Sequence, residues 1–143
     1  MRQIALINGD IAIGTDGGML MYSGAPRIKQ DLTLALSEEY GTDRFHPTWG
    51  SVLTQYLGQL LSPEMQQLVR AEVNRVLQNY LIIQQNDVIR DTTVDIQGRF
   101  DTSDVVQAVG KITVIQVLDA IYLSATLTTL ARQTVTISQQ VSA

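Results

Sequence analysis

The longest regular pattern of apolar and polar positions lies in the middle of the chain, over residues 63–90. Apolar residues recur there at spacings of three and four, at Met65, Leu68, Val69, Val73, Val76, Leu77, Tyr80 and Ile83. This spacing places them on one face of an α-helix. Ser62, Pro63 and Glu64 form a start signal, because Ser caps a helix, Pro suits its first position and Glu complements its dipole. We therefore predict a helix over residues 63–90 as the longest core element.

Two shorter helices are predicted before it, over residues 27–40 and 51–60. In each of them the apolar residues share one face. The first set is Ile28, Leu32, Ala35 and Leu36, and the second is Val52, Leu53, Tyr56, Leu57 and Leu60. Gly41 is suited to end the first helix as a C-cap residue, and Ser51 is suited to cap the second.

The last third of the chain changes to a period of two, which is typical of β-strands. Strands are predicted over residues 111–118, 121–130 and 134–140. Short connections join them, so we expect a three-stranded antiparallel meander whose final strand is an edge. The predicted fold class is α+β, with helices packed on a small C-terminal sheet.

Glycines punctuate the first 24 residues, and a turn signal at residues 15–18 separates the apolar runs 11–13 and 19–22. We predict an N-terminal hairpin or arm over residues 1–24, with a flexible terminus as the alternative, and one domain over residues 25–143. Between helix and sheet, Thr102 begins a short predicted helix that runs to Val109 and ends at Gly110. Residues 87–97 fit either helix or strand.

Composition excludes several classes of protein. The chain has 143 residues, no cysteine and a formal net charge of −4. Disulfides and zinc–thiolate sites are therefore excluded. No apolar run approaches the roughly 20 residues of a spanning helix, and there is no basic patch for nucleic acid. We expect no membrane, nucleic-acid, metal or cofactor binding.

A loop before the second helix contains the single His and the single Trp of the chain. His46 has no second His and no Cys to form a metal site, and no nucleophilic Ser signature accompanies it. We interpret the loop as a structural corner that offers aromatic bulk either to the core or to a partner. Its residues are Phe45, His46, Pro47, Trp49 and Gly50.

Catalysis by carboxylates has little support. Glu38 and Glu39 are adjacent, so they point about 100° apart on a helix. A glycosidase requires two carboxyl groups roughly 5–9.5 Å apart across its substrate. Asp43 is a candidate for the second group, but acidic residues beside a helix end are usually solvated. We therefore predict no catalytic residues, and the chain is not expected to be an enzyme.

The C-terminal strands carry the strongest binding signal. Arg132 is the only charged residue from residue 120 to residue 143. Natural proteins usually protect an edge strand of this kind with charge or Pro, unless another chain pairs with it. Strand addition from a partner is therefore a physical hypothesis. Its candidate residues are Ile121, Leu123, Ala125, Leu127, Thr134, Val135, Thr136, Ile137 and Ser138.

With the segment QDLTLALSEEYGTDRFHPTWGSVLTQYL (residues 30–57), the chain resembles the small baseplate wedge subunit, or sheath initiator, of contractile-tailed phages and contractile injection systems. The matching positions are Asn8-Gly9-Asp10, Gln30-Asp31-Leu32, and Pro47 with Gly50. The resemblance covers residues 8–141. Many members have a Glu-Pro-Arg triplet late in the long helix region, and residues 77–99 contain none, so that docking site is not transferred.

The resemblance implies a structural protein of the virion that is assembled in the host cytoplasm and located in a sixfold tail baseplate. Its partners would be the tail sheath protein, other wedge proteins and the hub or tube. Its C-terminal sheet would template the first sheath ring through strand pairing. Two alternatives are a peptidoglycan hydrolase, which matches a lysozyme-like label in the family, and a small intracellular adaptor.

Overall fold

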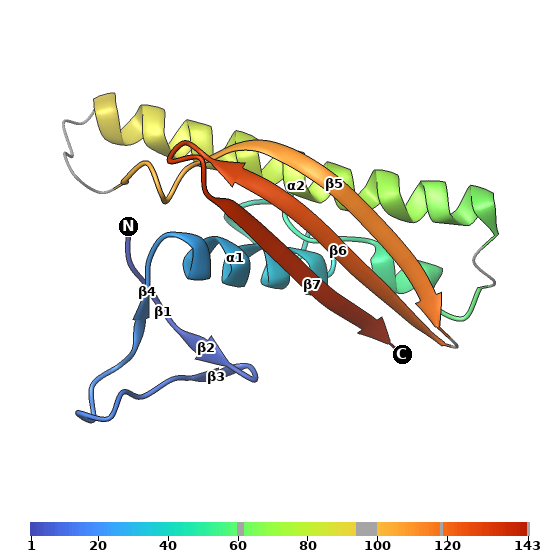
Figure 1. The fold of residues 1–143 in the computed structure, drawn as a ribbon, viewed down its shortest axis with the longest axis horizontal. Helices are drawn as coiled ribbons and strands as arrows, with labels where there is room; N and C mark the ends of the chain where they lie inside the picture. Colours follow the sequence, from blue (N-terminus) through green and yellow to red (C-terminus); the bar gives the residue numbers. More distant parts are fainter. Residues whose placement is uncertain (60–61, 94–99, 118, 143) are drawn as a thin grey trace.

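The computed structural model describes residues 1–59, 62–93, 100–117 and 119–142. Its body contains two α-helices, a short 3-10 helix and a three-stranded sheet, and four two-residue strands form an N-terminal arm (Figure 1). The arm strands are β1 (Gln3–Ile4), β2 (Leu6–Ile7), β3 (Asp10–Ile11) and β4 (Met21–Tyr22). The body elements are α1 (Ala25–Ser37), η1 (Leu53–Tyr56), α2 (Pro63–Thr93), β5 (Val106–Val117), β6 (Ala120–Thr129) and β7 (Thr134–Ser142).

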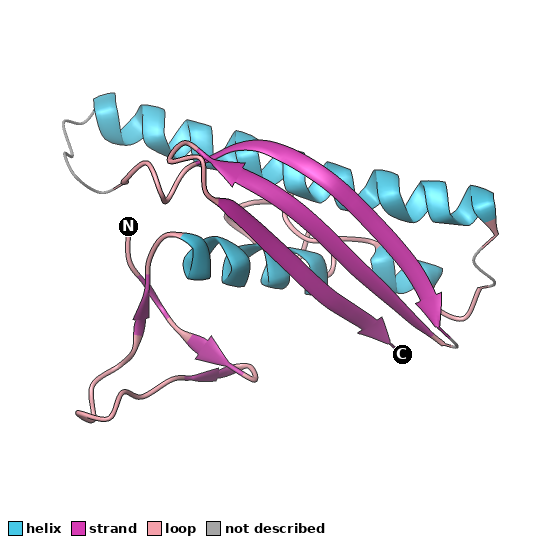
Figure 2. Ribbon diagram, viewed as in Figure 1, coloured by secondary structure: helices cyan, strands magenta, loops and turns pink. Residues whose placement is uncertain are grey.

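The body has two layers, a sheet and the helices behind it (Figure 2). The sheet is antiparallel in the order β5-β6-β7, and α1 and α2 pack against the same face of it. This confirms the predicted α+β class, the long central helix and the C-terminal meander with β7 at an edge. The other face of the sheet has no covering layer among the described residues (Figure 2).

The core lies between the two layers, where alternate residues of each strand meet the apolar faces of the helices. The sheet contributes Val106, Val114, Ile121, Leu123, Ala125, Leu127, Val135, Ile137 and Val141. The helices contribute Ile28, Leu32, Ala35, Leu36, Val69, Val73, Val76, Leu77, Tyr80 and Leu81. The apolar residues that recur every second position in the strands therefore pack against those that recur about every 3.6 positions in the helices, and together they form one core.

The start of α2 agrees with the sequence signal. The helix begins at Pro63, and the backbone N–H of Met65 donates to the Ser62 hydroxyl over 3.2 Å. Glu64 lies in the first turn, where a carboxylate complements the helix dipole. The described helix continues to Thr93, three residues beyond the predicted end, so residues 87–93 are helical. The rest of the ambiguous segment, residues 94–97, lies outside the described residues.

Three of the predicted helices differ from the structure. α1 ends at Ser37 because Glu39 forms a parallel bridge with Ser51, which draws the chain out of the helix. The helix predicted over residues 51–60 is only the single turn η1, and Leu60 lies outside the described residues. No helix forms over residues 102–109: residues 102–104 form a turn, and β5 begins at Val106 because β6 offers it a pairing partner.

Strand boundaries differ less. β5 begins five residues before the predicted residue 111, and Leu118, the predicted end, lies outside the described residues. β6 matches its prediction within one residue at each end, and β7 extends two residues further, to Ser142. Local pattern located all three strands, and pairing with β6 lengthened the two strands beside it.

The N-terminal arm consists of two small hairpins that protrude from the body (Figure 1). One turns at Asn8 and Gly9, which both have positive φ as a two-residue hairpin requires, and the other turns over residues 14–18. The strand segments cross at Ala5 and Ala12, where backbone bonds of 2.8–2.9 Å join Ala5, Ala12 and Leu20. The predicted hairpin is confirmed, and the Asn-Gly hairpin is an additional one.

Candidate functional site

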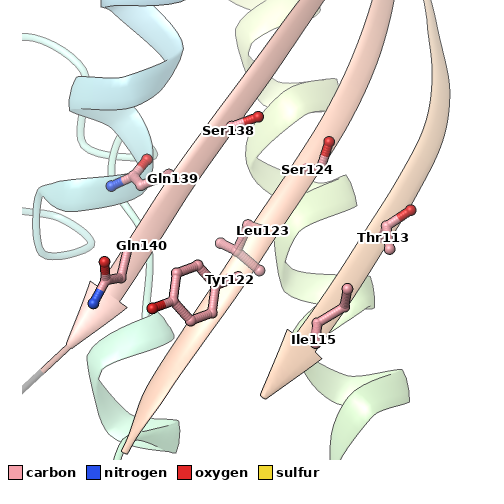
Figure 3. A pocket seen from close by; sticks show the side chains of 8 residues that line it. All are labelled: Thr113, Ile115, Tyr122, Leu123, Ser124, Ser138, Gln139 and Gln140. Atoms are coloured by element: carbon pink, nitrogen blue, oxygen red, sulfur yellow. The ribbon is translucent and has the colours of Figure 1, made fainter. Parts of the chain in front are cut away.

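The open face of the sheet carries mostly Ser, Thr and Gln side chains, with one Tyr, and none of those on β6 and β7 is charged. On the central strand β6 these are Tyr122, Ser124, Thr126 and Thr128, and on β7 they are Thr134, Thr136, Ser138 and Gln140. The register places Ser124 between Thr113 and Ser138, and Tyr122 between Ile115 and Gln140. Figure 3 shows these two rows around a hollow of about 330 Å³. Ile115 and Tyr122 are both exposed, so the face contains an apolar spot within a polar surface.

The outer edge of β7 carries backbone groups that no other strand of the described chain uses. The N–H of Thr129 donates to the carbonyl of Gln133 over 3.0 Å, which makes this pair a hydrogen-bonded one. Bonded and non-bonded pairs alternate along an antiparallel ladder, so the Ala125–Ile137 pair is also bonded. The backbone groups of the intervening residues therefore point away from β6. These residues are Thr134, Thr136, Ser138, Gln140 and Ser142.

The two edges of the sheet differ in their protection. β5 has register shifts between Val106 and Ala108 and between Val109 and Ile112, and Lys111 is exposed within the second one. Bulges and lysines are devices that keep foreign strands from pairing. β7 pairs with β6 without a shift over nine consecutive residues and has no charged residue and no Pro. The unprotected edge is therefore that of β7.

The central strand cannot accept a partner. β6 pairs with β5 on one side, except at Thr126, and with β7 on the other side. Its predicted pairing residues also face the helices and are at most 4% exposed: Ile121, Leu123, Ala125 and Leu127. Their assignment to strand pairing is wrong. Of the β7 candidates, Val135 and Ile137 direct their backbone groups to β6, and only Thr134, Thr136 and Ser138 direct theirs outward.

The aromatic loop is closed at its base by backbone bonds. The N–H of Gly41 donates to the carbonyl of Trp49 over 3.0 Å, and the N–H of Ser51 donates to that of Glu38 over 2.8 Å. Gly50 has φ +93°, and a Cβ there would lie 2.6 Å from the carbonyl oxygen of Glu39. Only Gly fits this crossing of two backbones.

Some side chains of the aromatic loop pack on the core, and others are exposed to solvent. Trp49 is half-buried, packs against the core and lies 6.3 Å from the ring of Tyr80. Phe45 is 86% exposed at the loop tip, and Pro47 and His46 are also exposed. His46 Nδ1 lies 3.3 Å from an Asp43 carboxylate oxygen. The loop is therefore a structural corner at Trp49 and Gly50, and Phe45 is its accessible aromatic group.

An ion pair on α2 holds this corner. The Arg75 guanidinium donates to the Gly50 carbonyl over 2.8 Å and to the Glu72 carboxylate over 2.7 Å, and it stacks 4.7 Å from the centre of the Tyr40 ring. Glu72 in turn accepts from the N–H of Val52 over 2.9 Å. Burial raises the pKa of Glu72, but hydrogen bonds from Arg75 and Val52 outweigh it, so the net pKa is lowered. Glu72 is therefore ionised and structural.

A buried polar network, which sequence reasoning missed, joins the arm, both helices and the turn before β5. Arg27 is 4% exposed and lies between two carboxylates, 3.2 Å from Asp31 and 3.6 Å from Asp104. Asp104 also accepts from the N–H of Gly24 over 2.7 Å and from the amino group of Met1 over 2.6 Å. The opposite charges at positions 27 and 31, one helical turn apart, are the signal that could have revealed part of it.

The two carboxylates of this network have opposite pKa shifts. Burial raises the pKa of Asp31 and outweighs the attraction of Arg27 and the hydrogen bond from Tyr80. Burial also favours a higher pKa for Asp104. Hydrogen bonds from the Met1 amino group and from two backbone N–H groups outweigh this effect, so the pKa of Asp104 is lowered. Each carboxylate has protein partners at hydrogen-bond distance, which is the pattern of a structural network.

Glu38 and Glu39, the carboxylates of the hydrolase alternative, are exposed. Asp43 accepts from the backbone N–H groups of Phe45 and His46, which fixes the loop tip. In the described part of the chain, no group of three or more His, Asp or Glu side chains is placed to hold a metal ion. Among the same residues, no helix has the length and apolar character needed to cross a membrane.

No protein-family model matches the chain, and no curated protein matches its sequence.

Proposed function

We propose that the chain is a structural assembly protein that accepts a strand from a partner along the outer edge of β7. The observation that carries the proposal is the contrast between the two sheet edges. β5 has register shifts and Lys111, whereas β7 is regular and uncharged, and no described strand pairs with its outer side. An edge of this kind promotes aggregation when it is left uncovered, so a partner strand that covers it is a physical expectation.

Main-chain hydrogen bonds would provide the contact. Each outward residue of β7 offers one N–H donor and one carbonyl acceptor, and each bond contributes about 1 kcal/mol net. A single added strand therefore binds weakly. Several such contacts in a closed ring would bind far more tightly, because every contact after the first is intramolecular.

We propose further that this partner is the sheath subunit of a contractile tail and that the chain is a baseplate wedge subunit. The support is the resemblance at Asn8-Gly9-Asp10, Gln30-Asp31-Leu32 and Pro47 with Gly50. The position of the unprotected edge in the C-terminal sheet is consistent with this role. On this proposal the chain would link wedge proteins to the first sheath ring in the virion, and it would act without catalysis.

Photocrosslinking in the assembled particle tests both the proposed binding edge on β7 and the proposed sheath partner. A benzophenone amino acid replaces Gln140 on β7, and a matched variant carries it at Gln107 on β5; both are exposed glutamines on outer strands of the sheet. We expect Gln140 to crosslink to the sheath protein and Gln107 to give no sheath adduct. Equal sheath adducts from both sites would refute the edge assignment. A small soluble adduct from Gln140 would support an adaptor and refute the sheath assignment.

A further inference from the structure

The N-terminal arm has an apolar tip that nothing in the described chain covers. Ile13 and Met19 pair across the second hairpin and are 71% and 61% exposed. Asp16 lies in the turn between them, where its carboxylate accepts from the N–H of Gly18 over 3.1 Å. Asp16 forms no ion pair with another described residue. The tip therefore presents two large apolar side chains beside one negative charge.

A groove of complementary character lies at the base of the same arm, between the arm and α1. Its volume is about 550 Å³, and its walls include the apolar side chains of Leu6, Tyr22, Pro26 and Leu34. Lys29 is the one charged residue among those lining the groove, and it is exposed and without an ion pair in the described chain. Asp10 belongs to the hairpin that supplies Leu6 to the groove, but Asp10 itself does not line it.

The groove is preformed. The Gln30 side chain accepts from the N–H of Leu6 over 2.7 Å and donates to the carbonyl of Ile4 over 2.9 Å. These two bonds fix the arm to α1 on the side that forms the groove. A ligand entering there would not have to order the walls first, which reduces the entropic cost of binding.

We propose that the arm tip of one copy docks into the groove of a second copy, with Asp16 beside Lys29. Charge complementarity is the argument for this occupant: the tip carries a free carboxylate and the groove a free ammonium group. The tip and the groove are different surfaces of one chain, so the contact is head-to-tail, and repetition produces a ring or an open filament. This contact does not involve β7 and goes beyond the proposed function.

Sedimentation of the purified full chain tests the proposal at protein concentrations up to about 1 mM, where even a weak contact of about −4 kcal/mol is half-populated. We expect concentration-dependent self-association. The tip variant Ile13→Ser/Met19→Ser loses the apolar contact, and the groove variant Lys29→Glu/Thr33→Glu replaces the matching positive charge with two negative charges that face Asp16. Each variant should weaken association by about a hundredfold. A control, Ile82→Ser/Ile89→Ser, removes equally exposed apolar groups from α2 and should associate as the wild type does.

Mixing the two variants gives the sharpest outcome. Each variant is monomeric alone, but the tip variant keeps its groove and the groove variant keeps its tip. A head-to-tail contact therefore predicts a 1:1 dimer on mixing that does not grow further. The double charge exchange Asp16→Lys/Lys29→Asp should restore the association that each single exchange removes.

A wild-type chain that stays monomeric at these concentrations, or a mixture that stays monomeric, would overturn the proposal. Loss of association in the α2 control would also overturn it. Far-ultraviolet circular dichroism and urea unfolding establish that the variants are folded, and all the substituted side chains lie at or near the surface. Ser138→Pro on β7 should leave self-association unchanged, so failure of this proposal is distinguishable from failure of the strand-pairing proposal.

Discussion

Proline substitution at two neighbouring residues of β7 tests which backbone groups face outward. Pro has no N–H, and its ring occupies the space where a partner carbonyl would lie. Ile137 is opposite Ala125 in a bonded pair, so Ile137→Pro removes a ladder bond and leaves a buried carbonyl without its donor. Ser138 is opposite Ser124 in a non-bonded pair, so Ser138→Pro removes no bond within the sheet.

The magnitudes follow from these contacts when each Pro variant is compared with Ala at the same site. At position 137 the lost bond costs about 1 kcal/mol and the unsatisfied carbonyl about 1–3 kcal/mol more, so we expect Pro to be about 3 kcal/mol less stable than Ala. At position 138 only the restriction of φ remains, and we expect about 1 kcal/mol or less. The assay is urea unfolding of the four isolated variants.

Equal Pro–Ala differences at the two positions would refute the assignment of outward backbone groups. If the assignment holds, Ser138→Pro remains folded and can be tested for binding. The missing donor and the ring should weaken a partner strand by about 2 kcal/mol, which is roughly 30-fold. Ser138→Ala, which keeps the N–H, should bind as the wild type does.

Other predictions concern the buried network and the loop. Asp104→Asn should cost about 3 kcal/mol in urea unfolding, because it leaves Arg27 buried with one fewer carboxylate. The lowered pKa of Asp104 contributes stability that is present above its ordinary value of 3.8 and is lost as pH falls through the folded pKa, so the Asn variant should lose stability less steeply below pH 3.8. The raised pKa of Asp31 changes stability with pH in the opposite direction, and Asp31 is present in both the wild type and the Asp104→Asn variant. Gly50→Ala should cost about 2 kcal/mol or more in thermal unfolding, because φ is positive and its Cβ meets the Glu39 carbonyl. Trp49→Ala should cost about 2 kcal/mol, less than a fully buried Trp, whereas Phe45→Ala should change stability by less than about 0.5 kcal/mol.

The regular elements were predictable because their signals are local. The start of α2 rests on Ser62, Pro63 and Glu64, and the strands rest on alternation that needs no knowledge of their partners. Errors arose where a distant partner decided the outcome. Val106 is in a strand because Thr129 of β6 pairs with it, although the sequence around Thr102 resembles a helix start.

The candidate binding surface was predictable only in part. The low charge of the tail indicated an unprotected edge strand. Which strand lies in the centre depends on the sheet order, which the sequence does not give. Because β6 is the central strand, its residues are not part of the candidate binding surface. The direction of each backbone group followed only from the Thr129–Gln133 bond. Asp104 gave no signal, because its partners Arg27 and Gly24 lie about 80 residues earlier in the chain.

A cryo-EM map of the assembled particle that contains this chain would test strand addition at β7 most directly. We predict a partner strand hydrogen-bonded to the outward groups of Thr136, Ser138 and Gln140, which extends the β5-β6-β7 sheet beyond β7. A map in which the outer edge of β7 faces solvent, with the chain held in place through other surfaces, would contradict the proposal.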